Sequence, residues 1–348
     1  MTSKERPSIG ITGYGAYVPP TVLTNDELAL VVDTSDEWIR RRTGIRTRRI
    51  LSEDQGVLDM AVAAAEAALA DAGVTADKIT DIRVAVNTWM RFPSLATQVQ
   101  RKIGAHAASA ADVAAGCAGF VYAMEEAYNK AFVERVRHGR AMTSLVIGVD
   151  GLSHITDWTD RSTCVLLGDG AGAVVLSENA PGEILAIHTH AQGNHGDLLY
   201  STPVLAPQIT VKSARAFSHD ETAPRPYLRM DGPRIYAIAV ETMARDVEAV
   251  IARYNETAAR PITVSDIGYL YPHQANLRIV EKVAERLAVP LDKVYTDGVV
   301  NFGNTSTASI PLGYRDVRDR LGPPPKGQLE IDVAFGAGLA SGAILRRT

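Results

Sequence analysis

The 348-residue sequence lacks several features that mark specialised classes of protein. It contains only two cysteines, so no disulfide framework can hold it together, and a chain of this length does not need one. No apolar run is long enough to cross a membrane, and the first residues contain no apolar segment of the secretory type. The formal net charge is -4 and no basic stripe dominates, which argues against nucleic-acid binding. We therefore expect a soluble cytoplasmic protein without nucleic-acid or membrane partners.

What is present is an ordinary globular composition, with 46% hydrophobic and 22% charged residues. An alanine-rich segment at 58–73 has helical spacing and ends at a glycine. Segments 81–89 and 144–153 indicate buried strands, and 163–177 indicates a pair of strands around a glycine-rich turn. Such alternation predicts an α/β fold with a covered sheet.

The order of elements repeats along the chain. Two Asp-Ile pairs begin at residues 81 and 266, each after a helix and before another helix, and they lie 185 positions apart. Cys117 and Asn304 lie 187 positions apart. A nearly constant offset predicts a duplicated α/β unit, divided at the polar segment 177–183 into halves 1–180 and 181–348. Cys117 and Asn304 should then face each other across a pseudo-twofold axis.

Cys117, in "ADVAAGCAGF", can be an apolar filler or a nucleophile. The surrounding small residues let a substrate approach, and the pattern predicts a helix beginning at the cysteine. A helix N-terminus offers free N–H donors and about half a positive charge, which stabilise a thiolate and can hold a thioester oxyanion. Cys164 lies in an apolar segment interpreted as a strand, and we expect it to be inert.

Four motifs in order carry a family resemblance: "DVAAGCAGF", "GDGAGAVVL", "YPHQANLRI" and "NFGNTSTASIP". Together with "TNDELALVVDTSDEWIRRRTGIRTRRI" at 24–50, they resemble β-ketoacyl-acyl carrier protein synthase III of the thiolase superfamily. The resemblance implies a duplicated five-layer α-β-α-β-α fold and a homodimer. It also implies a catalytic site formed by Cys117, His273 and Asn304.

The residue chemistry fits that site. An imidazole at His273 and an amide at Asn304 can both donate hydrogen bonds to the enolate oxygen that forms when a malonyl group loses carbon dioxide. The carbanion then attacks an acyl group held on Cys117. The expected reaction joins an acyl-coenzyme A starter to malonyl-acyl carrier protein, in fatty acid or polyketide biosynthesis. The alternative is acyl transfer to a hydroxyl, amine or carrier thiol without condensation. A non-catalytic scaffold is disfavoured by the complete site.

The resemblance also implies binding residues. Trp38 and Arg161 match the pair that sandwiches the adenine of coenzyme A, and Arg42 matches a phosphate contact. The basic run at 40–49 is then a phosphate site rather than only a solvated face. Gln274 and Arg278 match residues that meet the carrier protein. Phe92 matches an aromatic residue that crosses the dimer interface to cap the partner's acyl pocket.

Some features depart from the family pattern. Segment 197–230 is longer than expected and reads as a loop, which we expect to cover the tunnel mouth. Because of Pro233 and the bulky residues Trp89 and Met90, the sequence does not determine which acyl group is the substrate. These residues are compatible with a specialised pathway. A metal site among the histidines at 188, 190 and 195 is disfavoured because no acidic or thiol partner is grouped with them in the sequence. We therefore expect neither a metal nor a bound cofactor.

Overall fold

The computed structural model describes residues 7–178, 180–201 and 227–348, and most of its strands form two sheets. In the first sheet the strand order is β1-β7-β6-β4-β5. β4 is parallel to β5 and β6, whereas β7 is antiparallel to β6 and β1. The strands are β1 (Ile9–Tyr17), β4 (Asp81–Ala85), β5 (Ser109–Val113), β6 (Thr143–Asp150) and β7 (Gly170–Glu178).

The second sheet repeats this plan with the order β11-β12-β13-β8. β11 is parallel to β12, and β13 is antiparallel to β12 and β8. A single parallel bridge from Leu270 to Val294 takes the place that β5 has beside β4. The strands are β8 (Glu183–Ala191), β11 (Tyr269–Pro272), β12 (Leu329–Phe335) and β13 (Ala340–Arg347). The duplicated topology is confirmed. β7 and β8 belong to different sheets, and the domain boundary at 180/181 between them stays a prediction.

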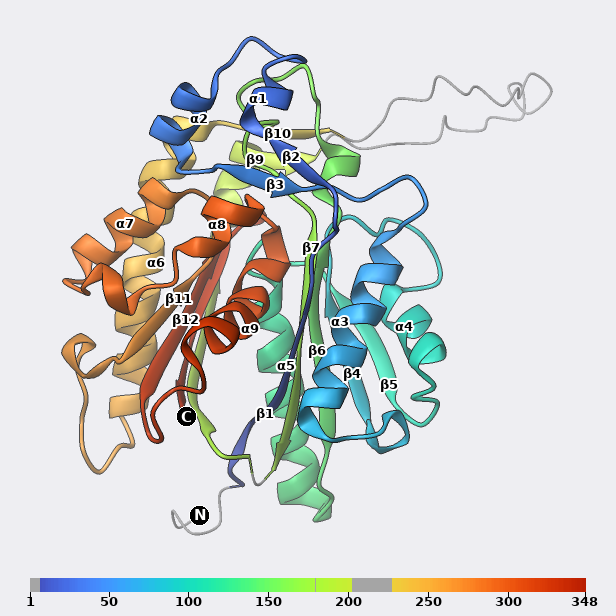
Figure 1. Cartoon of the computed structure of the whole chain (residues 1–348). Helices are drawn as coiled ribbons and strands as arrows, with labels where there is room; N and C mark the ends of the chain where they lie inside the picture. Colours follow the sequence, from blue (N-terminus) through green and yellow to red (C-terminus); the bar gives the residue numbers. More distant parts are fainter. Residues whose placement is uncertain (1–6, 179, 202–226) are drawn as a thin grey trace, which may run out of the picture.

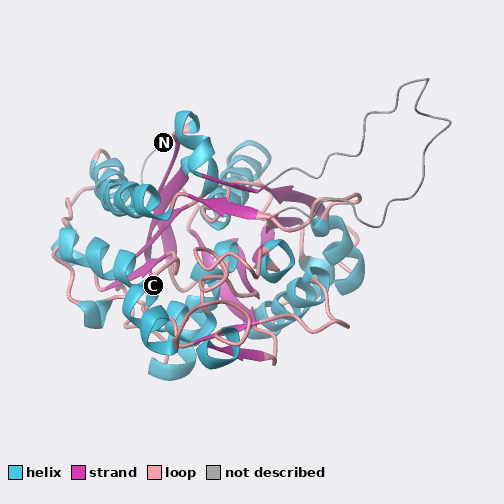
Figure 2. Cartoon of the chain, turned by 90° about the horizontal axis from the view of Figure 1, so that it is seen from above, coloured by secondary structure: helices cyan, strands magenta, loops and turns pink. Residues whose placement is uncertain are grey.

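Helices form three layers around the two sheets (Figure 1). α3 and α4 cover the outer face of the first sheet, α5 and α9 lie between the sheets, and α6 and α7 cover the outer face of the second. The view from above shows the strands enclosed by helices on both sides (Figure 2). The predicted five-layer fold is confirmed. The helices are α3 (Val57–Ala72), α4 (Leu95–Ile103), α5 (Gly119–His138), α6 (Gly232–Asn255), α7 (Leu277–Arg286) and α9 (Ser309–Leu321).

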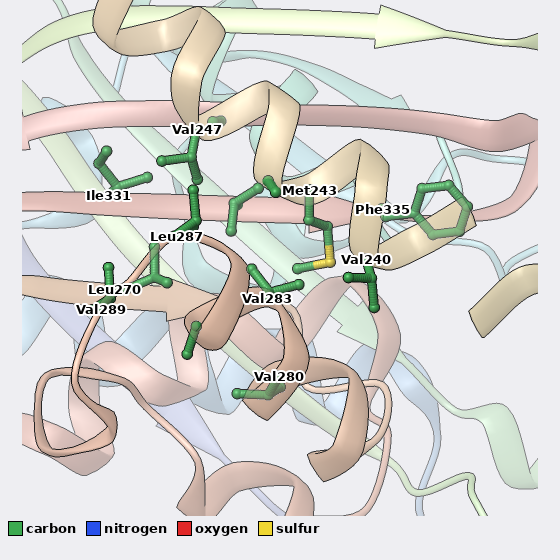
Figure 3. Close-up of a cluster of buried hydrophobic side chains, with 14 of the residues drawn as sticks. Val240, Met243, Val247, Leu270, Val280, Val283, Leu287, Val289, Ile331 and Phe335 are labelled. Carbon is green, nitrogen blue, oxygen red and sulfur yellow. The ribbon is translucent and has the colours of Figure 1, made fainter. Parts of the chain in front are cut away.

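The alternation of side chains along the strands builds the separate cores. On β6, Leu145 and Ile147 pack under α3 and α4, whereas Val146 points to the central layer with α5. In the second half, valines and leucines of α6, α7 and β11 pack with Ile331 and Phe335 of β12 (Figure 3). These clusters fix the ends of the strands, where the site residues lie.

Local signals explain where several elements begin and end. The predicted helix at 58–73 is α3, which ends at Gly73 in the left-handed conformation with φ of 63°. The predicted strand pair at 163–177 is wrong in its first half, because residues 161–166 form a turn and only β7 is a strand. The Asp160 side chain accepts the N–H of Ser162 at 2.9 Å and starts that turn. Its apolar residues are buried, which made the turn look like a strand.

The remaining elements lie at the upper end of the molecule in Figure 1. They are α1 (Asn25–Leu28), α2 (Asp36–Thr43), α8 (Asp297–Phe302) and the strand pairs β2 (Val22–Thr24) with β3 (Thr47–Arg49), and β9 (Leu199–Ser201) with β10 (Leu228–Met230). The predicted loop at 197–230 therefore has paired strands at its flanks, and its part at 202–226 lies outside the described residues. Over the described ranges, no helix combines the length and apolarity needed to cross a bilayer.

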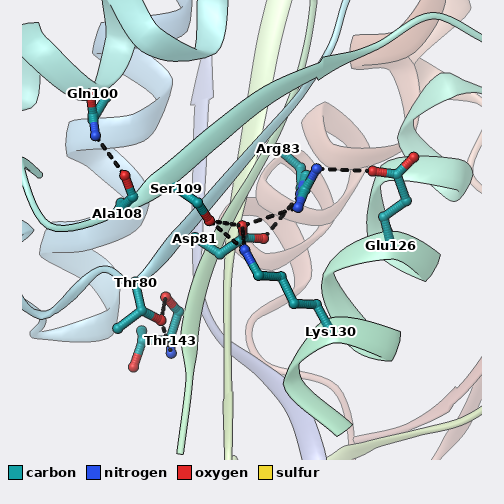
Figure 4. A network of polar contacts seen from close by, with 9 residues as sticks. All are labelled: Thr80, Asp81, Arg83, Gln100, Ala108, Ser109, Glu126, Lys130 and Thr143. Carbon is teal, nitrogen blue, oxygen red and sulfur yellow. Dashed lines mark hydrogen bonds and ion pairs between the residues drawn. The ribbon is translucent and has the colours of Figure 1, made fainter. Parts of the chain in front are cut away.

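The first Asp-Ile pair of the repeat carries a buried polar network (Figure 4). The Asp81 side chain is 0% exposed and accepts hydrogen bonds from Lys130 Nζ at 2.7 Å, Ser109 Oγ at 2.6 Å and Arg83 Nε at 3.1 Å. A buried carboxylate needs such partners, because an unpaired charge is costly away from water. The network ties β4 and β5 to α5, the helix that follows Cys117.

Candidate active site

Cys117 lies in the tight turn between β5 and α5. α5 begins at Gly119 with Ala118 as its N-cap, so the helix starts two residues later than expected. Gly116 has φ of 55°, a conformation that favours glycine. A Cβ added to Gly336 would lie 2.2 Å from the Cys117 nitrogen, so the turn that follows β12 packs directly on the cysteine backbone. Glycines on both turns let the two halves of the chain meet at the thiol.

Asn304 reaches the same place from the second half. Its backbone N–H donates to the Leu166 carbonyl at 2.8 Å, and its carbonyl accepts from the Gly168 N–H at 2.9 Å. The side-chain Oδ1 accepts the Ser306 N–H at 2.9 Å. Across the described part of the chain, Nδ2 makes no hydrogen bond. Because Oδ1 is fixed, the amide keeps a free donor for a substrate oxygen.

His273 follows β11 and is 2% exposed. Its backbone N–H donates to the Val333 carbonyl at 2.7 Å, and its ring Nδ1 lies 2.7 Å from Ser309 Oγ at the start of α9. Burial lowers the pKa of His273 to about 4, because the charged imidazolium would lose its hydration. The ring is therefore neutral near physiological pH. When Ser309 donates to Nδ1, Nε2 carries the proton and is a hydrogen-bond donor.

A cavity of about 590 Å³ brings the three predicted residues together. Cys117, His273 and Asn304 line it, with Trp38 and Arg42 among the other lining residues. A second cavity of about 360 Å³ also reaches Cys117 and Asn304, and its walls are mainly apolar. Its side chains include Trp89, Met90, Leu152, Ile155, Leu167, Leu228 and Met230. The thiol thus stands where two cavities meet.

The expected lowering of the Cys117 pKa is not confirmed. Burial raises the pKa of this thiol to about 11, and the nearby Asp150 raises it further, whereas a hydrogen bond from Ser306 lowers it. The thiol is protonated in the free protein, so its proton must leave as the sulfur attacks. Burial also raises the pKa of Cys164 to about 11; this residue is 0% exposed and sits in the turn at 161–166, not in a strand. That it is inert stays a prediction.

Of the predicted coenzyme A residues, Trp38 and Arg42 line the larger cavity, and Arg161 lies over Trp38. Arg161 Cζ is 5.0 Å from the centroid of the Trp38 ring, and its Nη1 donates to the Asp33 carbonyl at 2.9 Å. A base stacked between them needs about 3.5 Å on each face, about 7 Å in all. Arg161 must therefore move before an adenine can enter. Arg42 is exposed and lines the cavity.

Only part of the basic run at 40–49 is available to a ligand. Arg48 is 0% exposed and donates to Asn25 Oδ1 at 2.8 Å and to the Val165 carbonyl at 3.0 Å. Arg40 pairs with Asp36 at 3.0 Å on the surface of α2. Arg42 is the arginine of the run that lines the cavity with Cys117.

The structure places the remaining predicted residues as follows. Gln274 is 1% exposed and its side chain bonds to the Pro272 and Tyr295 carbonyls and the Val299 N–H, so the expected carrier contact is wrong for this residue. Arg278 is exposed on α7. Phe92 is 99% exposed and lines neither cavity of its own chain.

The histidines set aside as metal ligands have one acidic neighbour that the sequence did not reveal. His188 Nε2 lies 3.8 Å from Oδ1 of Asp246, a residue of α6. Within the ranges that the structure describes, no group of three or more His, Cys, Asp or Glu side chains has a metal-binding arrangement. The pair alone does not make a metal site.

Sequence reasoning missed three polar residues beside the nucleophile, namely Asn87, Asp150 and Ser306. Ser306 Oγ lies 3.4 Å from Cys117 Sγ, and Asn87 joins Ser306 to the buried Asp150. Asp150 lines neither cavity, so it cannot act as a base on a substrate there. The sequence signal that could have revealed them is Asp150, a carboxylate within the predicted buried strand 144–153.

A cysteine that meets a neutral histidine and an amide between two duplicated α/β halves is the arrangement of a thiolase-fold acyltransferase. Two family profiles match, 3-oxoacyl-[acyl-carrier-protein (ACP)] synthase III over residues 111–193 and its C-terminal domain over 257–348. The β-ketoacyl-[acyl-carrier-protein] synthase III of Xanthomonas campestris pv. campestris is 42% identical over 338 residues, which cover 97% of each chain. The chain belongs to the β-ketoacyl-acyl carrier protein synthase III family.

Solved structures agree with this assignment. The 3-oxoacyl-[acyl-carrier-protein] synthase III of Aquifex aeolicus VF5 superposes with a TM-score of 0.84 at 36% identity, covering 98% of this chain and 100% of its own. The priming β-ketosynthase of the R1128 polyketide biosynthetic pathway superposes with a TM-score of 0.82 at 33% identity, covering 99% of this chain and 97% of its own. The predicted family and fold class are confirmed.

Proposed function

We propose that this enzyme condenses an acyl-coenzyme A starter with malonyl-acyl carrier protein and releases carbon dioxide and a 3-oxoacyl-acyl carrier protein, in fatty acid or polyketide biosynthesis. The observation that carries the proposal is the junction of the two cavities at Cys117, with His273 and Asn304 lining the larger one. The smaller cavity, which includes Leu152, Ile155 and Leu228, suits the acyl chain. The larger cavity, which includes Trp38 and Arg42, suits the pantetheine arm that delivers it.

In the first half-reaction, Cys117 Sγ attacks the thioester carbonyl of the starter. The bond from that carbonyl to the sulfur of coenzyme A breaks, and the proton lost by Cys117 ends on the released coenzyme A thiol. No protein side chain therefore holds this proton after the first half-reaction. The raised pKa of Cys117 means that deprotonation contributes to the barrier of this step.

In the second half-reaction, the malonyl group loses carbon dioxide and leaves an enolate on the carrier thioester. The neutral His273 ring and the free Nδ2 of Asn304 donate hydrogen bonds to the enolate oxygen. The carbanion attacks the acyl carbonyl on Cys117, and a carbon–carbon bond forms. The bond from that carbonyl to Cys117 Sγ breaks, and the released thiolate takes up one proton from water. Decarboxylation supplies the carbanion, so the proposal includes no metal or bound cofactor.

Partners follow from the same geometry. Trp38 and Arg42 line the larger cavity and Arg161 lies over Trp38, so these three residues are placed to hold coenzyme A. Arg278 offers an exposed cation to an acidic carrier protein. Phe92 is an almost fully exposed aromatic residue, which favours a homodimer in which it caps the partner's apolar cavity. We place the enzyme in the cytoplasm, where these substrates occur.

Carbon dioxide release separates condensation from plain acyl transfer. Incubation with an acyl-coenzyme A and malonyl-carrier protein labelled in the free carboxyl should release one labelled carbon dioxide for each 3-oxoacyl product. Acyl transfer to the carrier without carbon dioxide would favour the alternative function. The free donor on Asn304 supports condensation, because acyl transfer does not need an enolate to be stabilised.

A further inference from the structure

Asp150 is a buried carboxylate that the proposed reaction does not use. It ends β6 and is 0% exposed. Oδ1 accepts from the N–H groups of Asn87 at 2.8 Å and Thr88 at 3.1 Å, and from Thr88 Oγ1 at 3.1 Å. Oδ2 accepts from Asn87 Nδ2 at 3.1 Å and from Thr307 Oγ1 at 3.0 Å. One carboxylate therefore links the segment after β4 to the turn that carries Asn304.

Asn87 extends this network toward the nucleophile. Its Nδ2 lies 3.1 Å from Asp150 Oδ2, 3.2 Å from the Gly116 carbonyl and 3.3 Å from Ser306 Oγ. All three neighbours can accept, so the NH₂ group must face them, because a flipped amide would set its oxygen against a carboxylate. Nδ2 carries two hydrogens for these three neighbours and cannot itself accept, so the Ser306 hydroxyl proton is directed to a different acceptor.

The nucleophile is one such acceptor, and Asp150 is a second one within reach of the hydroxyl. Ser306 Oγ lies 3.4 Å from Cys117 Sγ, while the Ser306 N–H donates to Asn304 Oδ1 at 2.9 Å. Ser306 has φ of 52°, in the left-handed region that residues other than glycine seldom adopt. Such an outlier is retained only where neighbouring contacts hold it, and these outliers gather at functional sites. This backbone conformation lets one residue touch Cys117 with its side chain and Asn304 with its amide.

We propose that Ser306 is a positioning residue for both half-reactions. Its hydroxyl, oriented by Asn87 and Asp150, donates to the thiolate of Cys117 as the thiol loses its proton, and its backbone N–H holds the amide of Asn304. The proposal rests on the proposed function only in taking Cys117 as the nucleophile. The two contacts are separable, because replacing the side chain removes the first and leaves the second.

The test is the pH dependence of Cys117 alkylation by iodoacetamide, with the modified residue located by peptide mass spectrometry. The titratable groups that face this site are Asp150 in the network, His273, Arg42, Asp231 and Tyr236 along the larger cavity, and Tyr200 along the smaller one. Ser306→Ala should raise the midpoint by about one pKa unit, and slow alkylation near neutral pH about tenfold, since a thiolate loses a hydrogen bond. Asn87→Ala should raise it by less. Ser144→Ala is the matched control, a buried serine on β6 whose hydroxyl has no partner in the described residues, and it should leave the midpoint unchanged.

An unchanged midpoint in Ser306→Ala overturns the proposal, and an unchanged midpoint in Asn87→Ala overturns the orienting role of that residue. Should Ser306→Ala fail to fold, Ser306→Gly removes the same hydroxyl and accepts the left-handed backbone. Condensation by the preacylated Ser306→Ala enzyme should slow by no more than alkylation does, about tenfold, because the same thiolate leaves while the backbone N–H still holds Asn304. A much larger loss of condensation would reduce Ser306 to a structural residue. Alkylation requires neither coenzyme A nor carrier, so a protein that shows the shift without condensing refutes the proposed function and not this one.

Discussion

Replacing Asn304 should slow one half-reaction and spare the other. Its Nδ2 has no partner among the described residues, while its Oδ1 is held by the Ser306 N–H at 2.9 Å. Asn304→Ala thus deletes one prepared donor to the enolate oxygen, a loss worth about 2.7 kcal/mol, or about a hundredfold in rate. His273 remains as the second donor, so the residual condensation should be measurable. The thiol and its neighbour Ser306 stay in place, and acylation should proceed at nearly the wild-type rate.

The assay measures each half-reaction separately. Intact-protein mass spectrometry follows acylation of Cys117 in single turnover, and carbon dioxide release from malonyl-carrier protein follows the second step on the preacylated enzyme. Asn304→Asp is the matched variant: it keeps the acceptor for the Ser306 N–H but replaces the donor with an anionic oxygen, and should lose at least as much condensation. Equal slowing of both half-reactions would show that Asn304 supports the turn rather than the enolate, and would refute the reasoning.

Three further outcomes are expected. Trp38→Ala should raise KM for acyl-coenzyme A more than it lowers kcat, because stacking is made before and during the chemistry; a pure kcat effect would place Trp38 in the core instead. Leu228→Trp should fill the smaller cavity and shift acylation toward shorter acyl groups. The control is Leu321→Trp, at a leucine that is 68% exposed, which should leave the preference unchanged. The same ranking of acyl groups in both variants would contradict this prediction. The pKa of His273 in the folded protein is about 4, against an ordinary 6.5, so the fold favours the neutral ring. The neutral ring's contribution to the free energy of unfolding is therefore complete above pH 6.5 and is lost as the pH falls toward 4. Urea unfolding should show this loss, up to about 3 kcal/mol, in the wild type but not in His273→Asn.

The duplication could be predicted because its signals are local and ordered, whereas the five-layer fold and the three central residues followed from the family resemblance of four short motifs. Helical spacing, buried strands and a constant offset between the halves indicate the duplication, and Cys117, His273 and Asn304 each sit in a short motif at an element boundary. The structure brings these three to one cavity. The three residues meet because the strands that precede them end at the same edge of the sheets, and this arrangement is set by the topology.

The rest depended on burial and on contacts that the linear order hides. Gln274 lies beside His273 in its motif, yet its side chain is buried and saturated. The pKa of Cys117 follows from desolvation by both halves, which outweighs the helix start considered from the sequence. Asn87 and Ser306 are 219 positions apart, so no local pattern could join them. In the turn at 161–166 the apolar residues Cys164 and Val165 are buried, and hydrophobicity alone does not distinguish them from residues of a strand.

The most direct test of the central claim follows the acyl group on Cys117. Wild-type protein and the Cys117→Ala and Cys164→Ala variants are incubated with a panel of acyl-coenzyme A starters, and their masses are measured before and after malonyl-carrier protein is added. The account predicts one acyl group on the wild type and on Cys164→Ala, none on Cys117→Ala, and loss of that group on addition of malonyl-carrier with one carbon dioxide released for each turnover. A mass gain that persists in Cys117→Ala, or an acyl group that leaves without carbon dioxide, would contradict it.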